Sequence, residues 1–129
     1  MIVIDASVVV DVLIADARAS PTRDLLAREE FTAPDLVDTE VASALRGLWL
    51  SRALDAPRLE RAVHDLGLLP CERQPSMLLI PRAMQLRANL TPYDAVYVAL
   101  AETLGCALLT KDRRLASAPG LRCEVMIAA

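Results

Sequence analysis

Two short apolar runs lie near the two ends of the chain, and an acidic residue closely follows each of them. Met1 to Ile4 leads directly into Asp5, and Cys106 to Thr110 is followed two residues later by Asp112. Short aliphatic and β-branched runs are typical of strands buried on both faces of a sheet. Because helices cover both faces of such a sheet, these runs favour an α/β architecture.

The segments between the two runs alternate between helical periodicity and short strand patterns. Ser20-Pro21, Asp55 before Pro57 and Thr91-Pro92 are typical helix starts. We expect helices at about residues 7–15, 20–26, 37–48, 55–67, 76–88 and 91–105, and further strands at 30–33, 68–72 and 122–127. This alternation predicts a mainly parallel sheet.

Two of the predicted helices carry apolar residues at helical spacing. These residues are Val37, Val41, Ala44, Leu45 and Leu48 in one helix and Leu59, Val63 and Leu66 in the other. We expect them mostly in the core, although the helices 36–50 and 59–69 also offer a partner surface with Trp49 as its anchor.

The composition fits one domain, residues 1–129, in which 54% of residues are hydrophobic and 3% aromatic. The chain has three widely spaced cysteines, Cys71, Cys106 and Cys123. Their number and spacing predict neither a set of disulfides nor a CxxC metal-binding motif, so we expect them to have a structural role. With no signal-peptide pattern and no run of about 18 apolar residues, we expect a cytoplasmic protein without membrane contact.

Four acids are predicted at one edge of the sheet. Asp5 and Asp112 follow strands, while Glu40 and Asp94 lie in the first turns of helices. In open parallel sheets, ligands gather at the carboxyl ends of the strands. Clustered carboxylates repel one another, and their hard oxygens suit Mg²⁺ or Mn²⁺. The pattern predicts a metal site that activates water. The net charge of −3 does not exclude a nucleic-acid partner, because bound metal ions would offset the negative charge of the acids.

Each acid also has a purely structural interpretation, which the sequence leaves open. Asp5 and Asp112 fit helix N-caps, Asp94 fits a capping pair with Thr91, and Glu40 fits a helix-dipole role. The conjunction of all four favours the metal site. The only histidine, His64, lies mid-helix and is expected to face solvent or to pack.

Polar residues flank two of the acids. The hydroxyls of Ser7 and Thr110 are candidates to orient the carboxylates, with capping or turn formation as the alternative. Lys111, Arg113 and Arg114 are candidates for RNA phosphate contacts, with a solvated charge run as the alternative. Tyr93 and Tyr97 flank Asp94, and the sequence does not decide which of them is core.

Four ordered motifs resemble the PIN-domain ribonucleases, and among them the VapC-like toxins of toxin-antitoxin pairs. The motifs are Val3-Ile4-Asp5-Ala6-Ser7, Pro34-Asp35-Leu36-Val37-Asp38-Thr39-Glu40-Val41, Thr91-Pro92-Tyr93-Asp94-Ala95 and Leu109-Thr110-Lys111-Asp112-Arg113-Arg114-Leu115. The resemblance covers essentially the whole chain. One departure is Leu115, where many relatives carry Phe, which affects packing near Asp112 rather than the acids.

The resemblance implies a PIN-like three-layer α/β/α fold with four to five strands. It also implies a Mg²⁺- or Mn²⁺-dependent endoribonuclease with Asp5, Glu40, Asp94 and Asp112 as metal-binding acids and Thr110 as the neighbouring hydroxyl. Structured RNA of the translation machinery, a VapB-like antitoxin and a homodimer are the implied substrate and assemblies.

Two other functions remain as alternatives. One is a PIN-like module that binds RNA or a partner without cleavage, against which the retention of all four acids argues. The other is an aspartate-based phosphotransferase with Asp5 as nucleophile, but Ser7 stands where a second acid is expected and Lys111 adjoins Asp112 rather than ending a separate strand.

Overall fold

The fold was obtained as a computed structural model that describes residues 1–15 and 20–129. Its helices are α1 (Ala6–Ile14), α2 (Pro21–Arg28), α3 (Val37–Leu50), α4 (Ala56–Leu68), α5 (Ile80–Gln85), α6 (Pro92–Leu104) and α7 (Arg113–Ala116), with a 3₁₀ turn, η1, at Met77–Leu79. Its strands are β1 (Ile2–Ile4), β2 (Phe31–Pro34), β3 (Glu72–Gln74), β4 (Ala107–Thr110) and β5 (Val125–Ile127).

The strands form one sheet in the order β3-β2-β1-β4-β5, and every neighbouring pair is parallel. The central strand β1 aligns Ile2 with Phe31 of β2 on one side and with Ala107 of β4 on the other. All residues of β1 and β2 are buried. The predicted α/β class and parallel sheet are therefore confirmed, with five strands.

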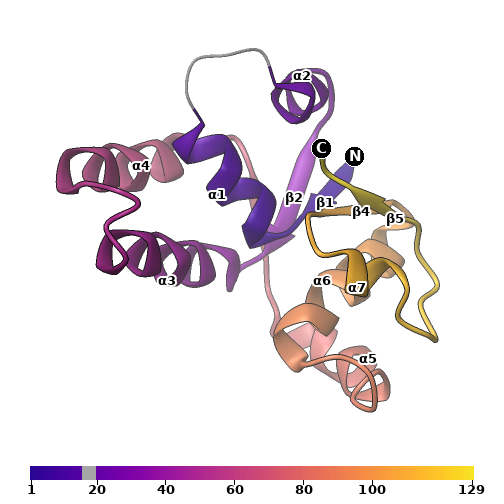
Figure 1. Ribbon diagram of the computed structural model, residues 1–129. Helices are drawn as coiled ribbons and strands as arrows, with labels where there is room; N and C mark the ends of the chain where they lie inside the picture. The colour runs from indigo at the N-terminus through magenta and orange to yellow at the C-terminus, as the bar shows by residue number, and fades with distance from the viewer. Residues whose placement is uncertain (16–19) are drawn as a thin grey trace.

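Helices lie on both sides of this sheet (Figure 1). Helix α6 contacts β1, β2 and β4 and is itself covered by α5. Helix α1 contacts β4 and also packs against α3 and α4. Residues Ala95 to Ala101 of α6 are all buried, so this helix is a central element of the core. None of the helices within the described residues is long and apolar enough to cross a membrane.

The strand predicted at residues 68–72 is wrong in its boundaries. Leu68 is the last residue of α4, and the strand is Glu72–Gln74. The guanidinium of Arg73 accounts for the difference, because it donates hydrogen bonds to the carbonyl oxygens of Leu66, Leu69 and Cys71 at 2.6–3.1 Å. The guanidinium thus caps the end of α4 at Leu66 and Leu69, and it also occupies the Cys71 carbonyl just before the strand. The edge strand β3 is therefore confined to the three polar residues Glu72–Gln74.

The predicted apolar faces of α3 and α4 need two corrections. Ala44 is exposed, and Val63 is 53% exposed, whereas Ala62 is buried in its place. Ala62 lies three residues after Leu59 and four before Leu66, which places all three on one helical face. Trp49 and Leu50 at the end of α3 are 46% and 53% exposed. Some apolar residues of this helical pair therefore face solvent.

The predicted helix at 76–88 is also interrupted. It consists of η1 followed by α5, and the chain turns from Leu86 to Asn89. Pro81 lies in the first turn of α5 and has no N–H to donate, which is consistent with a helix start at this point. Helix α6 ends as expected at Gly105, whose φ of 64° is left-handed and suits glycine.

Candidate active site

The four predicted acids come from four different elements and lie toward the carboxyl edge of the sheet. Asp5 directly follows β1, and Asp112 follows β4 after one intervening residue. Glu40 and Asp94 lie in the first turns of α3 and α6. All four side chains are half-buried. The parallel sheet thus gathers acids that are up to 107 positions apart in the sequence.

Asp5 is held by groups from two neighbouring strand ends. Its Oδ1 accepts hydrogen bonds from the Ser7 hydroxyl and, at 3.3 Å, from the backbone N–H of Val8. Its Oδ2 accepts a hydrogen bond from the Thr110 hydroxyl at the end of β4. The Thr110 oxygen in turn accepts a bond from the Asp112 N–H at 3.0 Å. Both hydroxyls therefore contact the Asp5 carboxylate, and their role at a metal site stays a prediction.

The capping interpretation is correct as well. Asp5 caps α1, Asp112 caps α7 by accepting from the Arg114 N–H at 2.9 Å, and the Thr91 hydroxyl caps α6. A carboxylate that caps a helix has one fixed orientation, which is also useful for holding a ligand. The structural and functional interpretations are therefore compatible.

Glu40 has a partner that the sequence reasoning did not identify. The hydroxyl of Tyr97 donates a hydrogen bond to Glu40 Oε1 at 2.7 Å. The side chain of Tyr97 is buried, whereas Tyr93 is 65% exposed, so Tyr97 is the core tyrosine of the pair. Tyr97 follows Asp94 by three residues in α6 and hence lies on the same helical face. That spacing is the signal from which its position could have been inferred.

The acids affect one another electrostatically. Burial raises the pKa of Glu40, and the negative charges of Asp94 and Asp5 raise it further, while the Tyr97 hydrogen bond lowers it. Burial also raises the pKa of Asp94, with contributions from Asp112 and Asp5. These effects show that the negative charges of the acids are close enough to repel one another. A cation there would relieve the repulsion between them.

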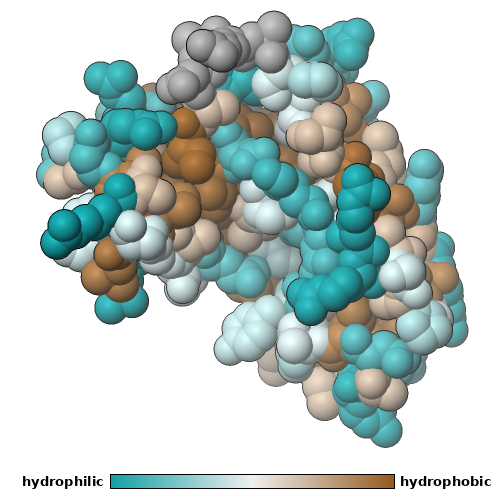
Figure 2. All heavy atoms as spheres, in the orientation of Figure 1, coloured by the Kyte–Doolittle hydropathy of each residue, from teal (hydrophilic) through white to brown (hydrophobic). Residues whose placement is uncertain are grey.

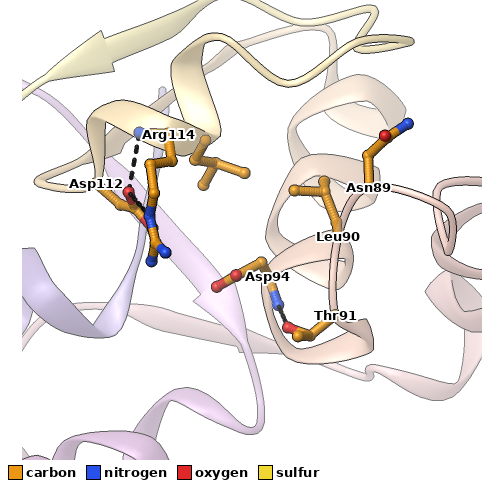
Figure 3. Close-up of a pocket in the computed structure, with 7 residues that line it drawn as sticks. Asn89, Leu90, Thr91, Asp94, Asp112 and Arg114 are labelled. Atoms are coloured by element: carbon orange, nitrogen blue, oxygen red, sulfur yellow. Dashed lines mark hydrogen bonds and ion pairs between the residues drawn. The ribbon is translucent and has the colours of Figure 1, made fainter.

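Asp112 differs from the other acids because it has a cationic neighbour. Its hydrogen bond with the Arg114 side chain lowers its pKa. In Figure 3, Asp94 and Asp112 approach a common hollow from α6 and from the start of α7, with the Arg114 side chain beside Asp112. Arg114 is 93% exposed, so solvent screens this ion pair strongly. The pair can open at little cost.

The three candidate RNA-contacting residues have different surroundings. Lys111 forms an ion pair with Asp11 of α1 at 2.8 Å, and Arg114 pairs with Asp112. Arg113 is exposed. Figure 2 shows hydrophilic side chains covering the region of α7. Three basic side chains therefore lie near the acids, and two of them form ion pairs within the protein.

The four acids supply only carboxylate oxygens as ligands, and such oxygens suit a hard divalent cation. Within residues 1–15 and 20–129, however, no three acidic, histidine or cysteine side chains are grouped closely enough to form a ready-made metal site. Asp5, Glu40 and Asp112 are each turned toward a partner within the protein. Metal binding would thus require side chains to reorient, above all Asp112, which is paired with Arg114.

Histidine and cysteine do not join this cluster. His64 is exposed on α4, in agreement with the sequence prediction. Cys71 is buried, and burial raises the pKa of its thiol to about 11, so it is protonated at neutral pH. Cys106 and Cys123 are half-buried free thiols. The predicted structural role of the cysteines agrees with these surroundings.

Comparison with known proteins extends over nearly the whole chain. The model of the PIN domain family matches residues 2–121. Ribonuclease VapC1 of Mycobacterium tuberculosis is 46% identical over 127 residues, which cover 97% of this chain and 96% of the relative. A relative this similar over its full length shares the fold and the family.

Solved structures with much lower identity have the same fold. VapC20 of Mycobacterium tuberculosis, described as a toxin that cleaves the sarcin-ricin loop, superimposes with a TM-score of 0.67 at 18% identity and covers 94% of this chain and 96% of its own. A toxin-antitoxin complex from Klebsiella pneumoniae gives a TM-score of 0.67 at 17% identity, covering 98% and 96%.

Proposed function

Because the chain belongs to the PIN-domain family, and within it to the VapC ribonucleases, we propose that it is an endoribonuclease that requires Mg²⁺ or Mn²⁺. The observation that carries this proposal is the convergence of Asp5, Glu40, Asp94 and Asp112 on one edge of the sheet, where burial and, to a smaller extent, the neighbouring acids raise the pKa values of Glu40 and Asp94. Mutual repulsion of this kind is costly for a protein without a cationic ligand.

The residues of the chain prepare the site before substrate arrives. Ser7 and Thr110 fix the carboxylate of Asp5, and Tyr97 fixes that of Glu40. When bound, a divalent cation supplies positive charge for the phosphodiester under attack and makes water a better nucleophile. We propose that Lys111, Arg113 and Arg114, which lie beside Asp112 in the sequence, contact neighbouring phosphates of an RNA. The fixed orientation of Asp5 and Glu40 reduces the reorganisation needed during the reaction, whereas Asp112 must first leave Arg114.

We propose structured RNA of the translation machinery, tRNA or rRNA, as the substrate class. Support comes from the description of the structurally similar VapC20 as a toxin that cleaves the sarcin-ricin loop. Two of the four acids, Asp94 and Asp112, line an open hollow, which suits an exposed loop better than the interior of a duplex.

We further propose that the chain acts in the cytoplasm as the toxin of a toxin-antitoxin pair, as a homodimer held inactive by a VapB-like antitoxin. The structural similarity to a toxin-antitoxin complex supports the antitoxin partner. The exposed side chains of Trp49, Leu50, Val63 and Leu68 on α3 and α4 offer an apolar surface for such a partner.

The proposed activity is tested with purified protein, total cellular RNA and Mn²⁺. We expect discrete cleavage products that disappear with EDTA and in an Asp5→Asn variant, which keeps the size of the side chain but removes its charge. Cleavage that persists in both controls would overturn the proposal. RNA that is retained but never cut would favour the binding-module alternative, and labelling of Asp5 by acetyl phosphate would favour the phosphotransferase.

The toxin role has a separate test. Induction of the chain in a bacterial host should arrest growth, and co-expression of the short reading frame next to its gene should restore it. Growth unaffected by the active nuclease would contradict the toxin role without affecting the proposed cleavage.

A further inference from the structure

We propose that Tyr97 is a positioning residue that sets the separation of Glu40 and Asp94 and thereby the affinity of the site for its divalent cation. The inference rests on the proposed function and assigns a role to a residue outside the four acids. It starts from the hydrogen bond of 2.7 Å between the Tyr97 hydroxyl and Glu40 Oε1.

The hydrogen bond joins two elements that otherwise bring their acids to the site independently. Glu40 belongs to the first turn of α3, whereas Tyr97 and Asp94 belong to successive turns of α6. Because Asp94 and Tyr97 are three residues apart in one helix, the helix fixes the distance between them. A bond from Tyr97 to Glu40 therefore also constrains Glu40 relative to Asp94.

The surroundings of Tyr97 make this constraint stiff. Its side chain is only 2% exposed, and its neighbours Val96 and Val98 are buried as well. A tyrosine ring packed in this way cannot swing to another partner without disturbing the core. The bond occupies only Oε1 of Glu40. Among residues 1–15 and 20–129, no hydrogen bond to the second carboxylate oxygen, Oε2, is formed, so this oxygen can meet a ligand.

Partners that orient metal-binding carboxylates typically change metal affinity about 10- to 100-fold when they are removed. Tyr97→Phe removes only the hydroxyl and keeps the ring in the core, so the fold should be preserved. We expect its affinity for Mn²⁺ to fall about tenfold. The matched control is Tyr93→Phe on the same helix, because the Tyr93 side chain is 65% exposed.

The experiment measures Mn²⁺ binding to the purified protein by electron paramagnetic resonance of free Mn²⁺, without RNA. Cleavage assays then give kcat and KM for RNA at saturating and at limiting Mn²⁺. For Tyr97→Phe we expect weaker Mn²⁺ binding, an unchanged KM for RNA, and recovery of much of the lost kcat at high Mn²⁺. Tyr93→Phe should match the wild type in all three quantities.

The possible outcomes distinguish the positioning role of Tyr97 from the proposed metal-dependent cleavage of RNA. Equal Mn²⁺ affinity of Tyr97→Phe and wild type, with cleavage intact, would overturn the positioning role and leave the nuclease proposal standing. A wild-type protein that binds no Mn²⁺ would overturn both. A loss of cleavage in Tyr97→Phe that high Mn²⁺ does not restore, together with a lower melting temperature in EDTA, would assign Tyr97 to the core alone.

Discussion

The hydroxyl of Thr110 donates a hydrogen bond to the carboxylate of Asp5, although 105 residues separate them in the sequence. Thr110 is fully buried at the end of β4, and Asp5 follows the adjacent strand β1. The same hydroxyl oxygen accepts a bond from the Asp112 N–H. One side chain thus connects two of the four acids, and its removal should affect both stability and activity.

The first prediction concerns Thr110→Val, which replaces the hydroxyl by a methyl group of similar size. We expect a loss of about 1–3 kcal/mol in the free energy of unfolding, because a buried hydrogen-bonding partner is left unsatisfied. RNA cleavage should fall about 10- to 100-fold because Asp5 loses an orienting contact. Urea unfolding and initial cleavage rates measure the two effects.

Thr32→Val is the control for Thr110→Val. Thr32 is equally buried, and its hydroxyl donates to the Glu72 carbonyl at 2.7 Å, away from the acids. The Thr32→Val variant should lose a similar amount of free energy of unfolding and keep its rate of RNA cleavage. Equal loss of activity in the two variants would show that the effect of Thr110 is stability alone.

The second prediction concerns Asp94→Asn, which should have opposite effects on stability and activity. The pKa of Asp94 is raised in the folded protein, so its ionised form disfavours folding at neutral pH. In EDTA the variant should therefore unfold at a higher temperature than the wild type, and this difference should vanish at a pH below the ordinary pKa of aspartate. Cleavage should be lost. A less stable variant in EDTA would contradict the electrostatic account.

The third prediction concerns the pH dependence of stability that Glu102 provides. Arg82 donates to both carboxylate oxygens of Glu102, at 2.7 and 3.1 Å, and the Arg122 N–H donates to Oε1 at 2.8 Å. These contacts lower the pKa of Glu102 below its ordinary value of 4.5. Their stabilisation is thus fully present above that value and is lost as the pH falls through the lowered pKa.

Glu102→Gln should consequently cost about 1.5–3 kcal/mol at neutral pH and progressively less in acid. Urea unfolding between neutral and strongly acidic pH measures this dependence. Glu60→Gln, at an exposed position on α4, should change stability little at any pH. A cost for Glu102→Gln that is constant with pH would be evidence against the charge as its origin.

The fourth prediction concerns Arg113→Ala. If exposed Arg113 contacts a phosphate, the variant should raise KM for RNA, and the slope of log affinity against log salt should become shallower by about 0.7 to 1. Arg46→Ala, exposed in the second half of α3, serves as the control. An unchanged salt slope for Arg113→Ala would assign Arg113 to the solvated surface. Filter binding at several salt concentrations in EDTA measures the slope.

The central elements of the fold were predictable because their sequence signals are strong. The apolar runs that form β1 and β4 and the long helix α6 with its Thr91 cap and Gly105 terminus appear in the structure nearly as expected. The peripheral strand β3 was misplaced, because its polar sequence Glu72-Arg73-Gln74 carries no hydrophobic pattern. Its position depends on the contacts of the Arg73 side chain, which local sequence does not reveal.

The positions of the acids were predictable, whereas their partners were not. The carboxyl ends of parallel strands lie at one edge of the sheet, independently of the conformation of the loops. The common location of Asp5 and Asp112 therefore follows from the topology. The contact between Tyr97 and Glu40 depends on how α3 and α6 are oriented across the core. Such an orientation is set by packing throughout the molecule rather than by any one motif.

The strand order β3-β2-β1-β4-β5 also has a consequence for synthesis on the ribosome. The central strand is made early, but its neighbour β4, the Thr110 hydroxyl and Asp112 are made about a hundred residues later. A nascent chain therefore cannot complete the cluster of acids until this late segment has left the exit tunnel. An enzyme of this topology would therefore be unable to cleave RNA until Asp112 has joined the three acids made before it.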